Sequence, residues 1–268
     1  MTPEIRRLYG VYATPRALVG FMVRSVHLLL QTKLGLLGGL ADPEVRLLDP
    51  AAGTGNFLRA AGWKAIEHHV SRGGDRREIV HDHLLPHFHG FEILPEVHVR
   101  GLTSLRRCLK ALGAGQDTEP RLTQADALEP PRDLLEIPFN VILGNPPWRG
   151  MSSHRGPWIT ELLREYQPKG ERNTKWLQDD YVKFLRLAQW RIDQTGEGIV
   201  ALVVNHNCLD ALTFRGLRAS LLHTFDEIRV LDLHGNRRKR ERAPDGTPDE
   251  NVFLGVAQGA AVLFLIKR

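Results

Sequence analysis

A short strand, a glycine-rich turn and a helix follow one another near the N-terminus, and this order most restricts how the chain can fold. Residues 45–49 read Val-Arg-Leu-Leu-Asp, residues 50–58 include Gly53 and Gly55, and a helix is expected to reach residue 70. Such a unit begins a nucleotide-binding βαβ fold, because the glycines admit a ligand close to the backbone and the helix N-terminus favours anionic groups. Leu58 replaces the third glycine of the dinucleotide fingerprint, which argues against nicotinamide and flavin dinucleotides.

The rest of the sequence alternates strands and helices, which predicts an α/β sheet with helices on both faces. Further strands are expected at 87–93, 121–127, 141–143, 198–205, 228–233 and 260–267. Helices are expected at 11–30, with Thr14 as N-cap, and at 95–112, 179–194 and 209–225. Residues 71–82 and 149–178 are interpreted as loops, and 228–267 as an antiparallel ribbon that closes the sheet.

Three of the expected strands end on an acidic residue, namely Asp49, Glu92 and Asp126. Each one alone is equally well explained as a solvated loop acid. Their repetition is harder to dismiss, because the carboxyl ends of parallel strands meet at one cleft, where ligands bind in open α/β sheets. Glu92 is suited to accept hydrogen bonds from ribose hydroxyls.

A stiff polar turn follows the strand at 141–143 and reads Asn145-Pro146-Pro147-Trp148. Each proline fixes φ and removes a backbone donor, and Asn145 is held extended because a proline follows it. The Asn145 amide and the Pro146 carbonyl therefore offer hydrogen-bond acceptors to a planar amino group, and Trp148 offers a flat face. Taken alone, the tetrapeptide is equally compatible with an ordinary proline-rich turn.

Composition indicates one large soluble domain of 268 residues in a reducing cytoplasm. Cys108 and Cys208 lack metal-type spacing, no signal peptide is apparent, and the longest apolar run, 253–266, is too short to span a bilayer. The histidines at 81, 83, 87 and 89 lack cysteine or acidic partners in a closed-site spacing, so no metal is expected. The net charge of +5 is compatible with a polyanionic partner.

Two segments are basic. Residues 149–178 begin with Arg149 and interleave Trp158, Tyr166 and Trp176 with positive charges, which fits either a nucleic-acid surface or an insertion that packs its own aromatic side chains. The loop at 236–251 carries five positive charges in six residues. Such a run is usually a solvated face, but on a loop it favours contacts with phosphates; its members are Arg237, Arg238, Lys239, Arg240 and Arg242.

These motifs, in this order, resemble those of the S-adenosylmethionine-dependent adenine-N6 DNA methyltransferases with the gamma motif arrangement. The similarity is greatest to the methylase modules of type IIG and type ISP restriction–modification enzymes and of related phage-defence enzymes. It rests on Asp49-Pro-Ala-Ala-Gly-Thr-Gly-Asn-Phe57, Asn145-Pro-Pro-Trp148, the Tyr12-Ala-Thr-Pro15 segment and Asn251-Val-Phe253. A serine at 145 would have suggested cytosine-N4 as the target, whereas asparagine favours adenine.

The resemblance implies a Rossmann-like class I methyltransferase, with a seven-stranded, mostly parallel sheet and an antiparallel last strand. It makes 1–268 a single catalytic domain, in which 1–42 carries the first cofactor motif, 149–178 is a lid or insertion, and 236–251 is a basic hairpin loop. It also implies that Glu92 binds the ribose of S-adenosylmethionine and that Asp126 binds its adenine amino group. Trp148 would stack on one face of a flipped base, and Phe184 is a candidate for covering the other face. The implied cofactor-binding set is Tyr12, Thr14, Pro15, Asp49, Ala51, Gly53, Thr54, Gly55, Asn56, Phe57, Glu92, Ile93, Asp126, Ala127 and Asn145.

The implied catalytic residues are Asn145, Pro146, Pro147 and Trp148, and the implied partner is DNA, contacted by Arg149 and the basic loop. Members of this arrangement carry a target-recognition domain after the last motif, whereas this sequence ends with its seventh strand. We therefore expect a partner subunit or a further C-terminal part, and weak or unspecific methylation by these residues alone. Alternatives are a protein-glutamine or RNA-adenine methyltransferase, whose substrates also present a planar NH2, or a catalytically idle cofactor-binding subunit of a defence complex.

Overall fold

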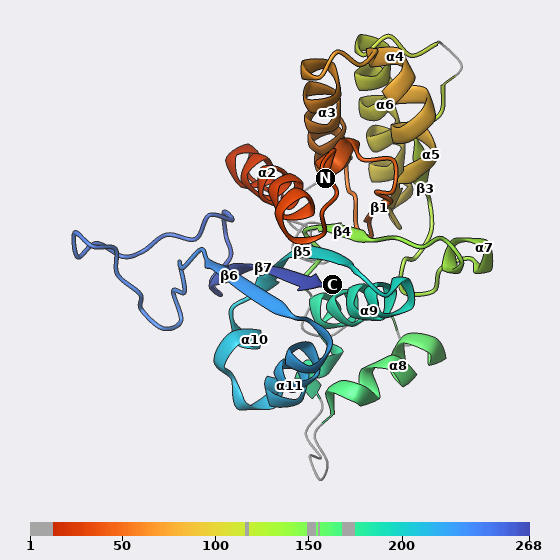
Figure 1. The fold of residues 1–268 in the computed structure, drawn as a ribbon. Coiled ribbons are helices and arrows are strands. Elements are labelled where there is room, and N and C mark those ends of the chain that lie inside the picture. Colours follow the sequence, from red (N-terminus) through yellow and green to blue (C-terminus); the bar gives the residue numbers. More distant parts are fainter. Residues whose placement is uncertain (1–12, 116–117, 149–153, 155, 168–174) are drawn as a thin grey trace.

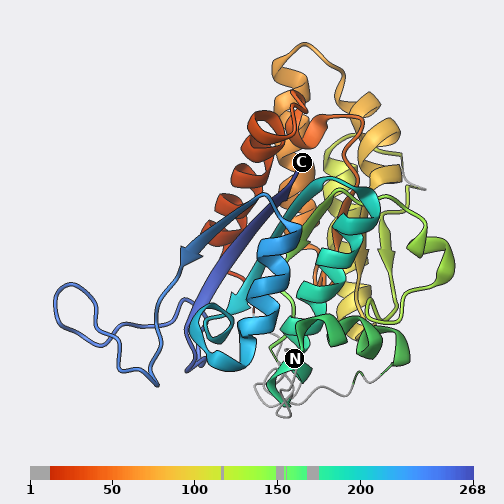
Figure 2. The ribbon, with the colours of Figure 1, turned by 60° about the horizontal axis from the view of Figure 1, so that its bottom comes forward.

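A seven-stranded sheet between two layers of helices organises the described part of the chain, which comprises residues 13–115, 118–148, 154, 156–167 and 175–268 of a computed structural model (Figures 1 and 2). The strand order is β3-β2-β1-β4-β5-β7-β6. Neighbours from β3 to β5 are parallel, whereas β7 is antiparallel to both β5 and β6. The predicted fold class is therefore confirmed. The strands are β1 (Leu47–Asp49), β2 (Phe88–Phe91), β3 (Arg121–Thr123), β4 (Val141–Gly144), β5 (Gly198–Asn205), β6 (Glu227–Asp232) and β7 (Ala260–Lys267).

Each face of the sheet carries its own helices and its own apolar core. One core joins the sheet to α2 (Arg16–Lys33), α3 (Asn56–Ser71) and α6 (Pro95–Ala111). The other joins it to α8 (Pro157–Leu163), α9 (Asp180–Thr195) and α11 (Arg215–Thr224). Further short helices are α4 (Arg76–Ile79), a π-helical turn (Val80–Leu84), α5 (Leu85–His87), α7 (Arg132–Leu135) and α10 (Asn207–Asp210). Short 3-10 helices cover Gly39–Ala41, Arg164–Tyr166, Lys175–Gln178 and Leu212–Phe214.

The central strands are apolar on both sides because both of their faces are covered. In β7, Val262, Phe264 and Ile266 enter the core under α2, while Leu263 and Leu265 alternate into the opposite core. This alternation follows from the two-residue period of a strand. The sequence ranges expected for β5 and β7 agree with the observed bounds for that reason: an unbroken apolar run marks a strand buried on both faces.

Several local expectations were wrong. Thr14 does not cap α2, which begins at Arg16 after Pro15 with no side-chain cap, because the Thr14 hydroxyl is engaged elsewhere. The strand expected at 121–127 ends at Thr123, so that Asp126 lies in the following turn. The expected loop at 71–82 is largely helical, since Asp75 caps α4 by accepting hydrogen bonds from two backbone amides.

The other corrections concern the α9–α11 side of the sheet. The helix expected at 209–225 is interrupted and resumes only at Arg215, because Ala211 adopts an extended conformation. The expected loop at 149–178 contains α8, whose seven residues are too few to show a helical period in the sequence. Pro157 stands at the start of this helix, where its missing donor costs nothing.

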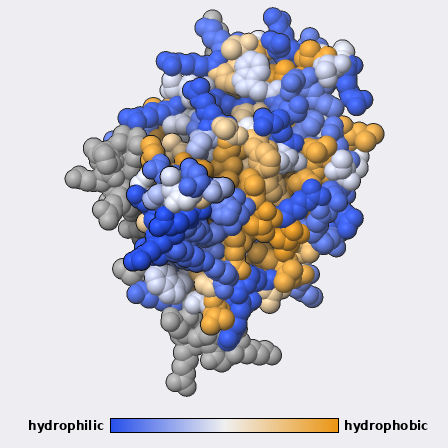
Figure 3. All heavy atoms as spheres, turned by 90° about the vertical axis from the view of Figure 1, so that its left-hand side faces the viewer, coloured by the Kyte–Doolittle hydropathy of each residue, from blue (hydrophilic) through white to orange (hydrophobic). Residues whose placement is uncertain are grey.

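Apolar side chains gather on the face where α2 lies beside the outer strands (Figure 3). Phe21 on α2 contacts Phe264 of β7 edge-to-face, and Phe21, Leu28 and Val230 of β6 are exposed by 40%, 57% and 49%. Lys33 of α2 forms an ion pair with Glu227 of β6 at 2.7 Å, which ties the helix to the edge strand. No helix within the described residues is long and apolar enough to cross a membrane.

Candidate active site

The carboxyl ends of β1, β2, β3 and β4 point the same way, because these strands pair in parallel. Chain order reverses at β1, which has β2 on one side and β4 on the other. Such a switch point is where open α/β sheets bind ligands. Asp49 is the last residue of β1, and the loops that leave these four strands carry the predicted glycine turn, the other two acids and the Asn145 turn.

Asp49 lies at the centre of this edge and is completely buried. Its Oδ1 accepts a hydrogen bond from the Ala51 amide at 3.2 Å, and its Oδ2 has no partner among the described residues. A Cβ atom on Gly144 would lie 2.7 Å from Asp49 Oδ1, so the carboxyl packs directly against the end of β4. Burial raises the pKa of Asp49 to about 8, with a smaller contribution from the charge of Glu92.

The glycine turn is fixed to the neighbouring strand and left open on its outer side. The Ala52 amide donates to the Phe91 carbonyl at 2.8 Å, which ties the turn to the end of β2. Gly53 and Gly55 have φ values of 57° and 77°, which favour glycine. A Cβ on Gly53 would meet nothing within 4 Å, whereas one on Gly55 would press against Leu105. The turn therefore presents an uncovered backbone, followed by the N-terminus of α3.

Glu92 follows β2 and is 9% exposed. Its Oε1 accepts from the Leu94 amide at 2.8 Å, and its own amide donates to the Thr123 carbonyl at the end of β3. Burial raises the pKa of Glu92, and hydrogen bonds from backbone amides, Leu94 first, oppose that rise. The Gly53 amide is among these donors, so the Glu92 carboxylate is tied to the glycine turn.

Asp126, in the turn after β3, is held by two donors. Its Oδ1 accepts from the Leu128 amide at 2.9 Å, and its Oδ2 contacts Nδ1 of His154 at 2.5 Å. The backbone carbonyl of His154 in turn accepts from Nζ of Lys183 on α9. This contact was not expected from the sequence, since nothing near His154 marks it as a partner of Asp126.

Asn145 leaves β4 with its side chain oriented by Thr14. Its Nδ2 donates to Thr14 Oγ1 at 3.0 Å, and its Oδ1 is buried with no hydrogen-bond partner among the described residues. Pro146 is buried, and Trp148 is partly buried. The Trp148 ring meets Phe253 edge-to-face, with 5.4 Å between ring centroids and 71° between planes. The turn thus combines an unpaired amide oxygen with an aromatic corner.

Phe253 was not singled out as a site residue. It is placed by Asn251, whose Oδ1 accepts from the Phe253 amide at 2.8 Å and whose Nδ2 donates to the Gln258 carbonyl at 2.5 Å. A signal was available, because Asn251-Val-Phe253 stands just before the last strand and resembles a late motif of the methyltransferases. Its pairing with Trp148 is a long-range contact that the sequence alone does not specify.

The remaining predicted site residues fall into three groups. Tyr12 and Arg149 lie outside the described residues. Phe57 and Phe184 are buried in the two apolar cores, Ala127 is 4% exposed, and Ile93 is 46% exposed beside Glu92. Ala51 and Thr54 belong to the turn between β1 and α3, and Asn56 is the first residue of α3, where its Oδ1 accepts a hydrogen bond from Arg59.

The basic loop lies between β6 and β7 and projects from the body of the molecule in both ribbon views (Figures 1 and 2). Arg237, Arg238 and Arg240 are exposed. Lys239 pairs with Asp210, and Arg242 donates to the Gly246 carbonyl at 2.6 Å. Four exposed arginines, Arg242 among them, thus lie on a loop whose base, at Phe253, contacts Trp148.

In the other basic segment, two of the three aromatic residues pack inward. Tyr166 is completely buried, and Trp158 meets Trp190 of α9 edge-to-face at 5.1 Å. Trp176 alone of the three is well exposed, at 46%, with Lys175 over its ring. The insertion therefore mainly packs its own aromatic side chains.

The clustered histidines make structural hydrogen bonds. His83 Nε2 lies 2.9 Å from the Leu40 carbonyl, and His89 Nε2 lies 2.9 Å from the Pro86 carbonyl. Burial lowers the pKa of His83 to about 4, so this ring is neutral near pH 7. In the described part of the chain, the residues with metal-ligand spacing are His234, Glu241 and Asp249, whose ligand atoms lie within 4.8 Å of one another at the base of the basic loop.

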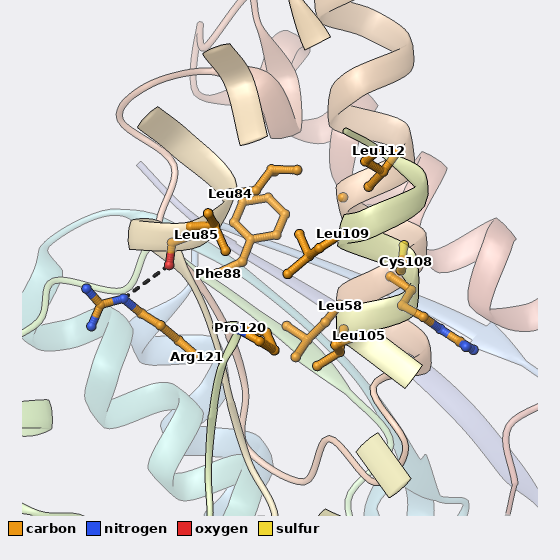
Figure 4. Close-up of a pocket in the computed structure, with 12 residues that line it drawn as sticks. Leu58, Leu84, Leu85, Phe88, Leu105, Cys108, Leu109, Leu112, Pro120 and Arg121 are labelled. Carbon is orange, nitrogen blue, oxygen red and sulfur yellow. Dashed lines mark hydrogen bonds between the residues drawn. The ribbon is translucent and has the colours of Figure 1, made fainter. Parts of the chain in front are cut away.

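A pocket lies between α3, α5 and α6 and holds none of the predicted site residues (Figure 4). Its walls are mostly apolar and come from α3, α5, α6 and the adjoining strand ends. Arg121 closes one side by donating to the Leu85 carbonyl at 3.1 Å. Leu105 lines this pocket and also packs close to Gly55, so the pocket lies next to the glycine turn.

Comparison with known proteins agrees with this picture. No protein-family model matches the sequence. A curated relative, the type II methyltransferase M.BstVI of Geobacillus stearothermophilus, is 26% identical over 215 residues, which are 75% of this chain and 36% of the relative. The chain therefore spans about a third of the length of that relative.

Solved structures share the fold. The type ISP restriction–modification enzyme LlaBIII bound to DNA superposes with a TM-score of 0.80 at 22% identity, over 96% of this chain and 19% of that one. The DrdV–DNA complex superposes with a TM-score of 0.79 at 24% identity, over 99% of this chain and 27% of that chain. A putative class I S-adenosylmethionine-dependent methyltransferase from Listeria monocytogenes superposes with a TM-score of 0.55 at 16% identity, over 95% of this chain and 60% of that chain. The class I methyltransferase fold and the resemblance to restriction–modification methyltransferases are thus confirmed.

Proposed function

We propose that this chain transfers a methyl group from S-adenosylmethionine to the N6 amino group of a flipped adenine in DNA, within a restriction–modification or phage-defence system. The observation that carries the proposal is the buried Asn145 Oδ1, which has no partner among the described residues and stands at the switch point beside Asp49. A buried acceptor without a donor is costly to the fold, which is why such atoms mark sites that a ligand completes.

The residues around the switch point fit the cofactor. Its methionine part would lie on the open backbone of Gly53, its ribose hydroxyls would donate to Glu92, and its adenine amino group would donate to Asp126. The unpaired Asp49 Oδ2 fits a positively charged ligand group, because such a group would favour ionisation of this buried acid. When bound, the cofactor supplies a methyl group on a positively charged sulfur.

Asn145 and Pro146 act on the target nitrogen. The lone pair of an exocyclic amine is delocalised into the base, which makes the amine a poor nucleophile. Asn145 Oδ1 and the Pro146 carbonyl accept its two hydrogens, which favours a pyramidal nitrogen and stabilises the positive charge that develops on it. The stiff Pro146-Pro147 backbone holds these acceptors in place, so that positioning supplies much of the rate.

Trp148 and Phe253 form two walls of a corner beside these acceptors. A base that is methylated on its exocyclic amine must leave the duplex stack and enter a pocket with aromatic surfaces. Trp148 offers one such face, and the edge-to-face contact with Phe253 fixes its ring orientation. The arginines of the β6–β7 loop would hold backbone phosphates close to this corner.

DNA is favoured over RNA and protein by the kinds of protein that share the fold, among them enzymes solved with DNA. Substrate recognition would require a partner subunit or a further domain, in line with the small share of those longer chains that is matched. An idle cofactor-binding role is disfavoured, because Asn145 Oδ1 and the Pro146 carbonyl together offer a pair of acceptors to a planar NH2 group of a substrate.

Transfer of a labelled methyl group from the cofactor tests the proposal. DNA, RNA and protein are offered in parallel to the wild type, to Asn145→Ala and to Asn207→Ala, a half-buried residue on α10 outside the site. We expect weak labelling of DNA by the wild type and Asn207→Ala, and loss of labelling by Asn145→Ala with cofactor affinity retained. Label found only in RNA or protein, or equal label from Asn145→Ala, would contradict the assignment.

A further inference from the structure

His154 reaches an acid that belongs to a distant part of the sheet edge. Asp126 follows β3, whereas His154 belongs to the segment after β4. In the sheet, β2 and β1 separate these two strands. Nevertheless, His154 Nδ1 lies 2.5 Å from Asp126 Oδ2. The contact therefore joins the segments that follow two strands separated by two others in the sheet.

The position of His154 is set independently of Asp126. Its backbone carbonyl accepts from Nζ of Lys183, a completely buried residue of α9, and its side chain is 19% exposed. Asp180, also on α9, adds a negative charge nearby. His154 is thus anchored to the helix layer on one side and directs its ring nitrogen toward Asp126 on the other.

Two donors fix the carboxylate of Asp126 while leaving part of its acceptor capacity unused. An ionised carboxylate offers about four lone-pair sites. The Leu128 amide takes one on Oδ1, and His154 Nδ1 takes one on Oδ2. With one donor on each oxygen, rotation of the carboxylate about its own bond is blocked. The remaining lone pairs therefore point in fixed directions.

We propose that His154 is a positioning residue that orients Asp126 to accept the exocyclic amino group of the cofactor's adenine. The inference rests on the proposed function, and it makes His154 a determinant of cofactor specificity. A purine with a carbonyl in place of that amino group would set an acceptor against the fixed carboxylate. Asp126 held by His154 rejects such a ligand, whereas a freely rotating Asp126 turns away and tolerates it.

A purely structural role for the same contact makes a different prediction. If His154 only ties its segment to the sheet edge, its loss loosens the cleft and weakens all cofactor-like ligands alike. If it orients Asp126, its loss weakens the binding of ligands that carry the amino group and leaves the binding of ligands that carry the carbonyl unchanged. The ratio of the two affinities therefore separates the roles.

The probes are S-adenosylhomocysteine and S-inosylhomocysteine, which differ at purine position 6, where an amino group faces a carbonyl, and at N1, which carries a hydrogen only in the inosyl ligand. Their dissociation constants are measured by calorimetry with the full chain, for the wild type and for three variants. His154→Phe keeps the ring without a donor. His154→Asn keeps a donor, since Nδ2 of asparagine is as many bonds from Cα as Nδ1 of histidine. Asp126→Asn replaces one carboxylate oxygen with a donor.

We expect the wild type to bind the adenosyl ligand at least tenfold more tightly than the inosyl ligand. That ratio should fall about tenfold in His154→Phe, which is the effect of one charge-assisted hydrogen bond. It should return to within about threefold of the wild-type value in His154→Asn and fall in Asp126→Asn. Thermal unfolding of each variant confirms that it is folded.

An unchanged ratio in folded His154→Phe, or equal weakening of both ligands, would overturn the inference and leave the proposed function intact. A ratio in His154→Asn as low as in His154→Phe would also overturn it, because the donor would then be irrelevant. If the wild type binds neither ligand, the proposed function itself fails, and this outcome is distinguishable from the other two.

Discussion

The Thr14 hydroxyl accepts a hydrogen bond from Asn145 Nδ2 at 3.0 Å, although the two residues are 131 positions apart. Thr14 stands just before α2, and Asn145 stands just after β4. The bond fixes the orientation of the Asn145 amide and leaves its buried Oδ1 as an acceptor without a partner among the described residues. An N-terminal residue thereby determines the chemistry offered by the Asn-Pro-Pro turn.

Replacing Thr14 by valine should lower the rate of methyl transfer about tenfold. Valine keeps the shape of threonine and removes the acceptor, so that the Asn145 amide is free to rotate and the net value of one hydrogen bond is lost. Binding of S-adenosylhomocysteine should change by less than about threefold. The measurement is single-turnover methylation of DNA, with Thr14→Ser as the control that restores the hydroxyl. A Thr14→Val enzyme as fast as Thr14→Ser would show that the bond does not orient Asn145.

Replacing Gly144 by alanine should lower stability by about 1–3 kcal/mol, the usual cost of forcing an extra methyl group into a packed site. The added Cβ would lie 2.7 Å from Asp49 Oδ1, which cannot move far because it is completely buried. Affinity for S-adenosylhomocysteine should fall as well, since Asp49 leads into the glycine turn. Urea unfolding and calorimetry measure the two effects.

Gly20→Ala is the matched control for that substitution. Gly20 lies in α2, where the new methyl group would meet only the flexible end of Arg24. Alanine is the better helix former, so this variant should be as stable as the wild type or more so. Equal stability of Gly144→Ala and Gly20→Ala would mean that β4 and Asp49 are less tightly packed than described.

Asp49 should make stability fall with rising pH. Its pKa is raised to about 8 in the folded protein, against an ordinary value of 3.8, because burial penalises the charged form. The folded state therefore holds a proton that the unfolded state has released, and the associated stability is lost as pH rises through the folded pKa. Between pH 5 and 8, the free energy of unfolding of the wild type should fall relative to Asp49→Asn by up to about 1.4 kcal/mol per pH unit.

Urea unfolding of the two proteins at several pH values in that range provides the test. His27 and His83, whose pKa values are lowered to about 4 by burial, contribute slopes of the opposite sign. These contributions are present in both proteins and cancel in the difference. Parallel pH profiles for the wild type and Asp49→Asn would refute a protonated, buried Asp49.

The elements that the sequence predicted well are those with a local cause. Gly198–Asn205 and Ala260–Lys267 are unbroken apolar runs buried on both faces, so that their bounds could be read directly. The glycine turn could be placed because only glycine readily adopts the φ values of Gly53 and Gly55. The placement of Asp49, Glu92 and Asp126 at or just after the carboxyl ends of neighbouring parallel strands followed from the order of strands and acids in the sequence.

What the sequence could not show depends on contacts between distant segments. Thr14 has the local signature of an N-cap, and only the folded chain brings Asn145 to its hydroxyl. His154 carries no local signal for its contact with Asp126, and the Trp148–Phe253 pair joins the β4 turn to the base of the β6–β7 loop. The helical turns at 76–84 were missed because their charged residues resemble a solvated loop.

The exposed arginines of the β6–β7 loop should dominate the salt dependence of DNA binding. Replacing Arg237, Arg238 and Arg240 by serine removes three charges from a loop whose base contacts Trp148. Affinity for DNA should fall more than tenfold, and the slope of log K against log salt should lessen by about 0.9 for each phosphate that the variant no longer neutralises. Fluorescence anisotropy with a DNA duplex between 50 and 200 mM salt, roughly the range in which this effect is largest, measures both quantities.

The control replaces the same number of arginines at the opposite end of the molecule. Arg72, Arg76 and Arg77 are exposed near the C-terminal end of α3, which runs away from the carboxyl ends of the strands. Their replacement by serine changes the net charge equally and should leave the salt slope nearly unchanged. An equal fall in affinity for both triple variants would indicate that net charge, and not this loop, binds DNA.

The central claim is that Asn145 Oδ1 and the Pro146 carbonyl accept the hydrogens of an adenine amino group. Mass analysis of nucleosides, released from DNA after incubation with the protein and S-adenosylmethionine, tests it most directly. We predict that the wild type forms N6-methyladenine and that Asn145→Ala forms none while still binding the cofactor. Methylation at cytosine N4, or undiminished N6-methyladenine from Asn145→Ala, would contradict the account.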